Sequence, residues 1–232
     1  MRCPSLVVSL VLLSPLLQAA GAPNWQRWPV GKFTRLPEVN TRIDFAHYNR
    51  DLMAAAIFHE TNRARVKEGL KAFLHLPQLD DAADLQASTG AMLASVGHHN
   101  PFPALATIDD RVHAVGLNFL RTAENIALTM ALDGDPAGTS VGVNHDGPQT
   151  VFFDPQTRRV LEPLTYAAFA TVVVAHWMRS PGHRANILDR ELHYLGCSAR
   201  WHKDYSGIDM LYSVQVFFTP QPTKGDQLKP PR

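Results

Sequence analysis

The chain has little of what marks several common classes of protein. Only 2 of its 232 residues are cysteines, its formal net charge is +1, and it contains no internal repeat. A charge balance this close to neutral gives no reason to expect a polyanionic partner, so nucleic-acid binding is not expected. After residue 22 no apolar run approaches the ~20 residues of a spanning helix, so the mature chain should have no transmembrane segment.

The first 22 residues have the features of a secretory signal peptide. A positively charged start precedes an apolar run over residues 6–17, which Ser14 and Pro15 interrupt, and small residues follow at its exit. We expect cleavage after Ala20 or Ala22. The mature protein should therefore be secreted, to the periplasm or to the outside of the cell.

Cys197 stands alone once Cys3 leaves with the signal peptide. A single cysteine in an exported chain is either a buried small side chain or a reactive thiol. Its neighbours, "HYLGCSARW", are typical of a strand interior. Burial statistics then favour the structural role.

The rest of the sequence predicts one folded domain over residues 43–219, between two Pro-rich and basic segments. Residues 23–42 show no apolar period and predict an extended N-terminal arm, and residues 220–232 predict a flexible tail. The arm carries Trp25, Trp28 and Phe33 among basic residues. It is suited either to contact a surface or to pack as a belt over the domain.

Helices are predicted in the first part of the domain. One ends near Gly69, and a second begins at Asp80 and has a stripe of small side chains that lets another element approach closely. The stripe consists of Ala83, Ala87, Gly90 and Ala94. A third helix over residues 165–178 is apolar on all sides, which predicts that it is buried together with His176.

Strands are predicted in the last part. Two β-branched and aromatic runs joined by residues 202–208 predict an antiparallel hairpin, and a smaller hairpin is expected around Asp154 and Pro155. Helices first and strands last indicate an α+β domain.

The stretch "AHWMRSPGHRANIL" predicts a break between two helices. Ser180 is suited to cap a short helix that has Pro181 at its first position, which holds His183 in the first turn. Arg184 is expected to be solvated or salt-bridged. Asn186 is expected to stabilise the turn, because asparagine readily bonds nearby backbone groups.

Two motifs that suggest enzymes do not fit their context. "HETNR" at His59 begins like the zinc-protease helix but has Arg63 where the second histidine must stand. "GTSVG", residues 138–142, matches the nucleophile-elbow pattern but lacks the preceding strand and the following helix.

Three separated pieces, "GHHNPF", "AENIA" and "SPGHRANIL", occur in this order together with "YLGCSARW" and "YSVQVFF". In this order and spacing they resemble the CAP superfamily (cysteine-rich secretory proteins, antigen 5 and pathogenesis-related 1), and specifically its secreted bacterial branch. The resemblance implies a three-layer α-β-α sandwich with a central antiparallel sheet and one open cleft.

The resemblance also implies three cleft residues, which are His98, Glu124 and His183. The family's second cleft glutamate has no match after Trp177, and Ala123 replaces a glycine of the motif. Two imidazoles and a carboxylate are suited to bind Zn²⁺ or another divalent cation, with Glu124 as a ligand or as the partner that orients an imidazole. A hydrogen-bonded network without metal is the alternative.

The missing carboxylate has an electrostatic consequence. With only Glu124 to balance two imidazoles, at least one histidine pKa should lie below the free value of about 6.5.

Three classes of function stay open. The first is a secreted binding module whose cleft accepts a lipid, glycan or peptide. The second is a zinc-dependent hydrolase with Glu124 as base, and the third is a structural envelope-associated protein that contacts its partner through the arm. We favour the first, because no second carboxylate, nucleophile or oxyanion donor is evident for catalysis.

Overall fold

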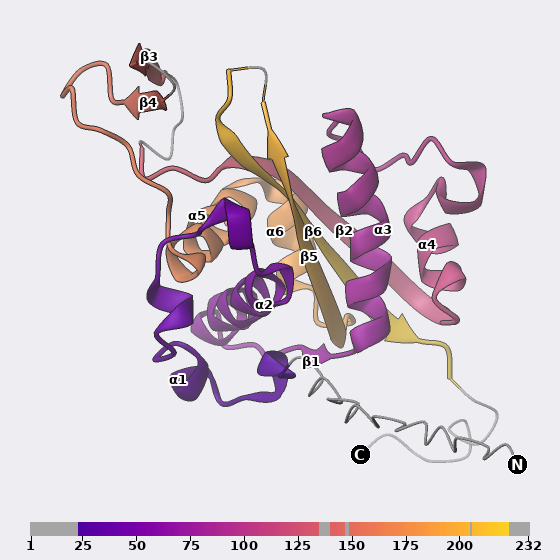
Figure 1. The fold of residues 1–232 in the computed structure, drawn as a ribbon. Helices are drawn as coiled ribbons and strands as arrows, with labels where there is room; N and C mark the ends of the chain where they lie inside the picture. Colours follow the sequence, from indigo (N-terminus) through magenta and orange to yellow (C-terminus); the bar gives the residue numbers. More distant parts are fainter. Residues whose placement is uncertain (1–22, 135–139, 147–148, 205, 223–232) are drawn as a thin grey trace, which may run out of the picture.

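The computed structural model of the chain describes residues 23–134, 140–146, 149–204 and 206–222. The expected signal peptide and residues 223–232 of the expected tail lie outside these ranges. A four-stranded sheet in the order β1-β5-β6-β2 runs through the middle of the molecule, with helices on both sides (Figure 1).

The predicted hairpin is confirmed as the centre of this sheet. It consists of β5 (Tyr194–Lys203) and β6 (Asp209–Pro220), and β2 (Phe119–Met130) pairs antiparallel with the other side of β6. At the opposite edge, β1 (Leu74–His75) pairs parallel with β5. The sheet is therefore mixed, and not antiparallel throughout as expected.

Helices from the two halves of the chain cover the faces of the sheet (Figure 1). On one face lie α2 (Arg50–Lys67), α5 (Tyr166–Arg179) and α6 (Pro181–Leu188), and on the other lie α3 (Pro77–Leu93) and α4 (Ile108–Ala114). This arrangement confirms the three-layer α-β-α sandwich.

Alternation along β2 shows that the two layers have separate cores. Successive side chains of a strand point to opposite faces of the sheet. Ile126 packs with α3 and α4, whereas Ala127 packs in the cluster that contains Ile187 of α6. Neighbouring residues of β2 therefore reach different helical layers.

The small-residue stripe of α3 allows the close approach that the sequence predicts. Ala83 and Ala87 are fully buried, and a Cβ placed on Gly90 would lie 2.1 Å from the ring of Tyr212 on β6. Only glycine fits at this contact. Ala94 does not belong to the contact surface, because it is exposed and ends the helix with a φ of 49°.

α5 differs from its prediction, because it is buried on one side only. Phe169, Val173 and Trp177 are fully buried along one face, as expected. His176 is exposed, which contradicts its expected place in a buried helix. Ser180 is the N-cap of α6 and Pro181 its first residue, but the Ser180 side chain makes no capping hydrogen bond.

The N-terminal segment is not extended as the sequence predicts. It forms η1 (Trp25–Arg27), α1 (Val30–Phe33) and η2 (Glu38–Asn40), and η3 (Phe45–His47) follows before α2. The ring of Phe33 is buried and stacks on His59 of α2 at a centroid distance of 4.3 Å. The apolar side chains of the segment gain burial against α2 and α5, so it packs as a belt.

A second, two-stranded sheet consists of β3 (Gly142–Asp146) and β4 (Gln149–Phe153). The turn expected at Asp154 is present, since its amide lies 2.8 Å from the carbonyl of Arg159. Across this turn, Phe153 and Val160 form an isolated bridge instead of the expected hairpin. The strand that pairs with β4 is β3, which precedes it in the chain. One further short helix, η4 (Pro103–Leu105), precedes α4, and no helix among the described residues is long and apolar enough to cross a membrane.

Candidate functional site

His98 and Glu124 form a direct hydrogen-bonded pair between the segment that follows α3 and the middle of β2. Nδ1 of His98 lies 2.9 Å from Oε1 of Glu124. A carboxylate only accepts hydrogen bonds, so the proton of this contact is on Nδ1. The Glu124 side chain is 2% exposed and the His98 side chain 63% exposed. The buried carboxylate thus fixes an imidazole that remains open to solvent.

Arg111 of α4 completes the surroundings of Glu124. Its guanidinium is fully buried, and Nη2 donates to Oε2 of Glu124 at 2.6 Å. Nη1 also donates to the carbonyl of Leu105 at 2.9 Å. Both oxygens of the Glu124 carboxylate are therefore engaged by cationic or polar donors.

Sequence reasoning missed Arg111, because its helix resembles an ordinary surface helix. Its role can be recognised only in the fold, where its buried guanidinium lies beside the buried carboxylate of Glu124. A fully buried arginine is rare unless it is paired, and Glu124 is the carboxylate that pairs with it.

Asparagine side chains connect α6 to β2 behind this pair. Nδ2 of Asn186 donates to the carbonyl of Glu124 at 3.2 Å and to Oδ1 of Asn125 at 2.9 Å. Nδ2 of Asn125 in turn donates to the carbonyl of His183 at 3.1 Å. Asn186 thus joins two distant elements, rather than stabilising its own turn as predicted.

His183 approaches this region from the opposite helical layer. Its Nδ1 atom is buried and has no hydrogen-bond partner among the described residues. Within the same residues, no hydrogen bond or ion pair joins His183 to His98 or Glu124. The three predicted residues therefore consist of one bonded pair and one neighbour, and a cleft common to all three stays a prediction.

The two histidine pKa values shift in opposite directions. The hydrogen bond to Glu124 raises the pKa of His98, although burial and the nearby charge of Arg111 oppose the shift. Burial, together with the charges of His98 and His176, lowers the pKa of His183. The direction for His183 agrees with the expectation that one histidine pKa falls below 6.5.

The donor set does not fit a zinc site in which Glu124 is a ligand. Both oxygens of Glu124 are already engaged, and among the described residues no group of three or more His, Cys, Asp or Glu side chains is placed to hold a metal ion. Zinc sites in proteins use three or four such ligands. The observed geometry is that of a carboxylate that orients an imidazole.

Other residues that the sequence singled out have structural roles. Arg184 forms a salt bridge of 3.2 Å with Glu68, as expected. Cys197 is buried, and burial holds the pKa of its thiol well above the ordinary value, which confirms the structural reading. Nε2 of His59 lies 2.9 Å from the carbonyl of Trp25. Within "GTSVG", the motif that does not fit a nucleophile elbow, residues 138 and 139 lie outside the described part of the chain.

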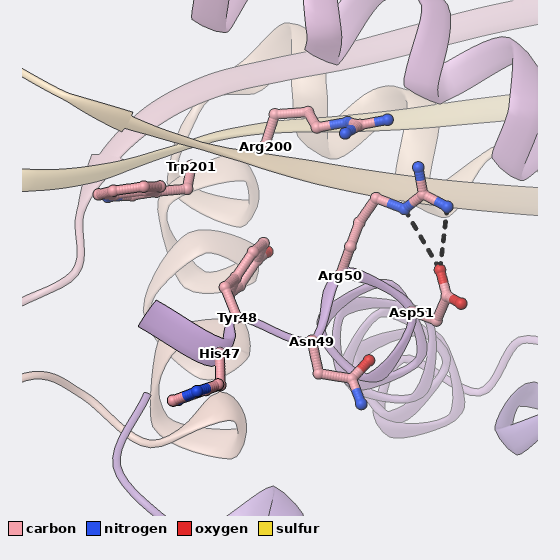
Figure 2. Close-up of a pocket in the computed structure, with 7 residues that line it drawn as sticks. All are labelled: His47, Tyr48, Asn49, Arg50, Asp51, Arg200 and Trp201. Carbon is pink, nitrogen blue, oxygen red and sulfur yellow. Dashed lines mark hydrogen bonds and ion pairs between the residues drawn. The ribbon is translucent and has the colours of Figure 1, made fainter. Parts of the chain in front are cut away.

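A cavity of about 600 Å³ lies at the N-terminal end of α2 and does not include the predicted site residues (Figure 2). Its charged side chains are balanced within the fold. Arg50 pairs with Asp51 and Asp84, and Arg200 pairs with Asp84. These ion pairs leave no unmatched charge that would point to a ligand.

The family follows from comparison with known sequences. A model of the cysteine-rich secretory protein family, CAP, matches residues 58–217, which is more than half of the chain. The chain belongs to the CAP family. A search of curated proteins gives no match.

Several solved structures are similar to this CAP domain. An extracellular protein containing an SCP domain from Bacillus anthracis is 19% identical, with a TM-score of 0.47, over 73% of this chain and 41% of that protein. An outer surface protein from Borrelia burgdorferi is 17% identical, with a TM-score of 0.48, over 78% of this chain and 99% of that protein. A cysteine-rich secretory protein from Staphylococcus aureus is 16% identical, with a TM-score of 0.41, over 73% of this chain and 39% of that protein. The chain thus spans less than half of the first and third proteins.

Proposed function

We propose that the chain is an exported CAP-domain binding module whose ligand, a lipid, glycan or peptide, contacts His98 and His183. The engagement of Glu124 is the observation that carries this proposal. Its carboxylate is buried and holds Arg111 and His98 through separate oxygens. It therefore orients His98 and is not free to activate water.

The state of His98 indicates what kind of group the ligand offers. The raised pKa keeps its exposed imidazole protonated to a higher pH than a free histidine. A protonated imidazole only donates hydrogen bonds, so the ligand should present a carboxylate, phosphate or carbonyl oxygen. Binding should weaken as the pH rises through the raised pKa of His98.

A zinc-dependent hydrolase is the second candidate. It is favoured by the hydrogen bond from His98 to a carboxylate, since imidazoles that bind a metal are commonly oriented in this way. It requires that Glu124 be released from Arg111 to act as base or metal ligand. Leaving a fully buried guanidinium without its partner would cost about 3–5 kcal/mol, so this candidate ranks below the binding module.

An envelope-associated role through the N-terminal segment has less support. Phe33 is buried against α2, and Trp25 and Trp28 pack against the same core. Few of the aromatic side chains that would make such a contact remain available to a partner.

Export rests on the sequence of residues 1–22. The test is mass spectrometry of the mature N-terminus, on protein recovered from the periplasm and from the medium. A chain beginning at Gly21 or Pro23 would support export, and an intact N-terminus in the cytoplasm would contradict it.

One set of variants distinguishes a binding module from a hydrolase. Purified protein is titrated with phosphatidylglycerol vesicles, soluble peptidoglycan fragments and peptides, and it is also screened for ester, amide and phosphoester hydrolysis with added zinc. We expect binding of one probe that is lost in His98→Gln and kept in the exposed control Arg179→Gln. Zinc-dependent hydrolysis that His98→Gln abolishes while the fold is retained would favour the hydrolase instead.

A further inference from the structure

A second cavity, of about 590 Å³, lies between the C-terminal end of α2, β1 and the segment that precedes β5. Basic side chains that line it are Arg65, Lys71 and Arg190, and leucines that line it are Leu70, Leu74 and Leu192. No acidic residue is among the residues that line it. Its volume lies within the range of about 300–1,000 Å³ that is typical of ligand pockets.

Arg65 is a buried cation that forms no salt bridge with any described residue. Its residue is 4% exposed, and its guanidinium lies 3.7 Å above the ring of Phe73. Its only acceptors among the described residues are backbone carbonyls, for example that of Lys71 at 2.8 Å and that of Asp189 at 2.9 Å. The charge of Asp189 attracts the Arg65 guanidinium, but the carboxylate of Asp189 is paired with Arg121 at 2.9 Å.

This imbalance points to an anionic ligand. Burying a charge is costly unless an opposite charge accompanies it, and arginine remains protonated even when burial lowers its pKa. The exposed side chains of Lys71 and Arg190 add positive charge around the same cavity. An anion bound here would supply the direct ion pair that Arg65 lacks among the described residues.

The walls indicate that the anion is attached to an apolar group. Leu74 is 60% exposed although it belongs to the sheet, and Leu70 and Leu192 also line the cavity. The backbone nearby offers further contacts, because the amides of Lys71 and Ala72 donate no hydrogen bond to any described residue. An extended peptide chain can satisfy such groups, whereas an acyl chain cannot.

We propose that this cavity binds the carboxy-terminal end of a peptide whose last residue is apolar. The terminal carboxylate faces Arg65, and the last side chain packs on Leu70 and Leu74. Backbone groups of the peptide pair with the amides of residues 71–72. The site shares no residue with the His98 region, so it is independent of the function proposed above.

The test uses a fluorescent hexapeptide ending in leucine, prepared with a free carboxyl terminus and as the carboxamide, and measured by anisotropy with the whole purified chain. The carboxamide should bind at least about tenfold more weakly, because a hydrogen bond to a charged group contributes about 1.5–3 kcal/mol. The double variant Lys71→Glu and Arg190→Glu should also weaken binding. The exposed charge reversal Arg179→Glu and the site variant His98→Gln should leave it unchanged.

Three results would overturn the proposal. They are equal binding of the carboxyl and carboxamide peptides, no loss in the double variant, and complete competition by dodecanoate at the concentration of the peptide itself. The last would assign the cavity to fatty acids. Because the exposed variants keep Arg65 and its carbonyl contacts, a loss of binding in them is not a loss of the fold.

Discussion

Two buried arginines in this CAP domain differ in how their charge is balanced. Arg111 donates to the carboxylate of Glu124 at 2.6 Å, and this carboxylate also holds His98. Arg65 is almost as deeply buried, but among the described residues its hydrogen-bond acceptors are all backbone carbonyls, and its guanidinium lies over the ring of Phe73. The first charge is neutralised by a direct ion pair, and the second only feels the charge of Asp189, which is paired with Arg121.

The difference suggests how the two regions are used. A neutralised pair favours a single rigid arrangement, and it presents His98 to solvent in a fixed orientation. A buried cation without a direct ion pair is instead a position where an external anion gains the most, because its binding removes an existing cost. One region is therefore suited to orient a side chain, and the other to receive a charged ligand.

The largest effect is expected from breaking the neutralised pair. Glu124→Gln leaves Arg111 buried without a negative partner, so the free energy of unfolding should fall by about 3–5 kcal/mol. Urea denaturation followed by circular dichroism measures it. The matched control is Glu68→Gln, which breaks an exposed salt bridge and should change stability by less than about 1 kcal/mol. Equal effects of the two substitutions would show that Arg111 does not depend on Glu124.

An intermediate effect is expected from Arg65→Met. Methionine keeps apolar contact with Phe73 but removes the hydrogen bonds to backbone carbonyls, which should cost about 1–3 kcal/mol. Removing an unbalanced charge offsets part of this loss. In the same denaturation experiment, Arg65→Met should therefore lower the free energy of unfolding by less than Glu124→Gln does. A larger decrease for Arg65→Met would contradict the contrast between the two arginines.

The smallest effect is expected from pH, and it has opposite signs for the two histidines. The pKa of His98 is raised, so its stabilising contribution is complete below about 6.5 and is lost as the pH rises through the folded value. The pKa of His183 is lowered, so its contribution is present above about 6.5 and is lost as the pH falls through the folded value.

NMR titration of the two imidazoles measures these shifts directly. His98→Gln provides the control, because removal of the His98 charge should bring the pKa of His183 closer to its free value. The assignment of opposite shifts would be wrong if both pKa values moved in the same direction. It would also be wrong if the pKa of His183 did not change in His98→Gln.

Several features could be predicted from local sequence patterns. The final hairpin follows from two β-branched and aromatic runs, and the close contact at Gly90 follows from a stripe of small residues. The exposure of His176 could not be predicted, because helical periodicity shows which residues are apolar but not how far neighbouring elements extend over them. The belt of residues 25–40 was one of two alternatives that the sequence left open, since its aromatic side chains lack a period and become buried against α2 and α5.

The sequence by itself determined the final hairpin and the family, and it named His98, Glu124 and His183 as candidates for one site. It did not determine the order of helices and strands, because β1 to β4 precede α5 instead of following the helices. Only the tertiary structure decided which charges are neutralised. Arg111 lies 13 positions from Glu124, and the carbonyl of Ile187 that Arg65 contacts lies 122 positions away. Burial and the distance between charges set the energy of an ionised group, and both depend on residues that are far apart in the chain. Arg65 and Arg111 look alike in the sequence, but the fold makes Arg111 a partner of Glu124 and gives Arg65 no salt bridge among the described residues.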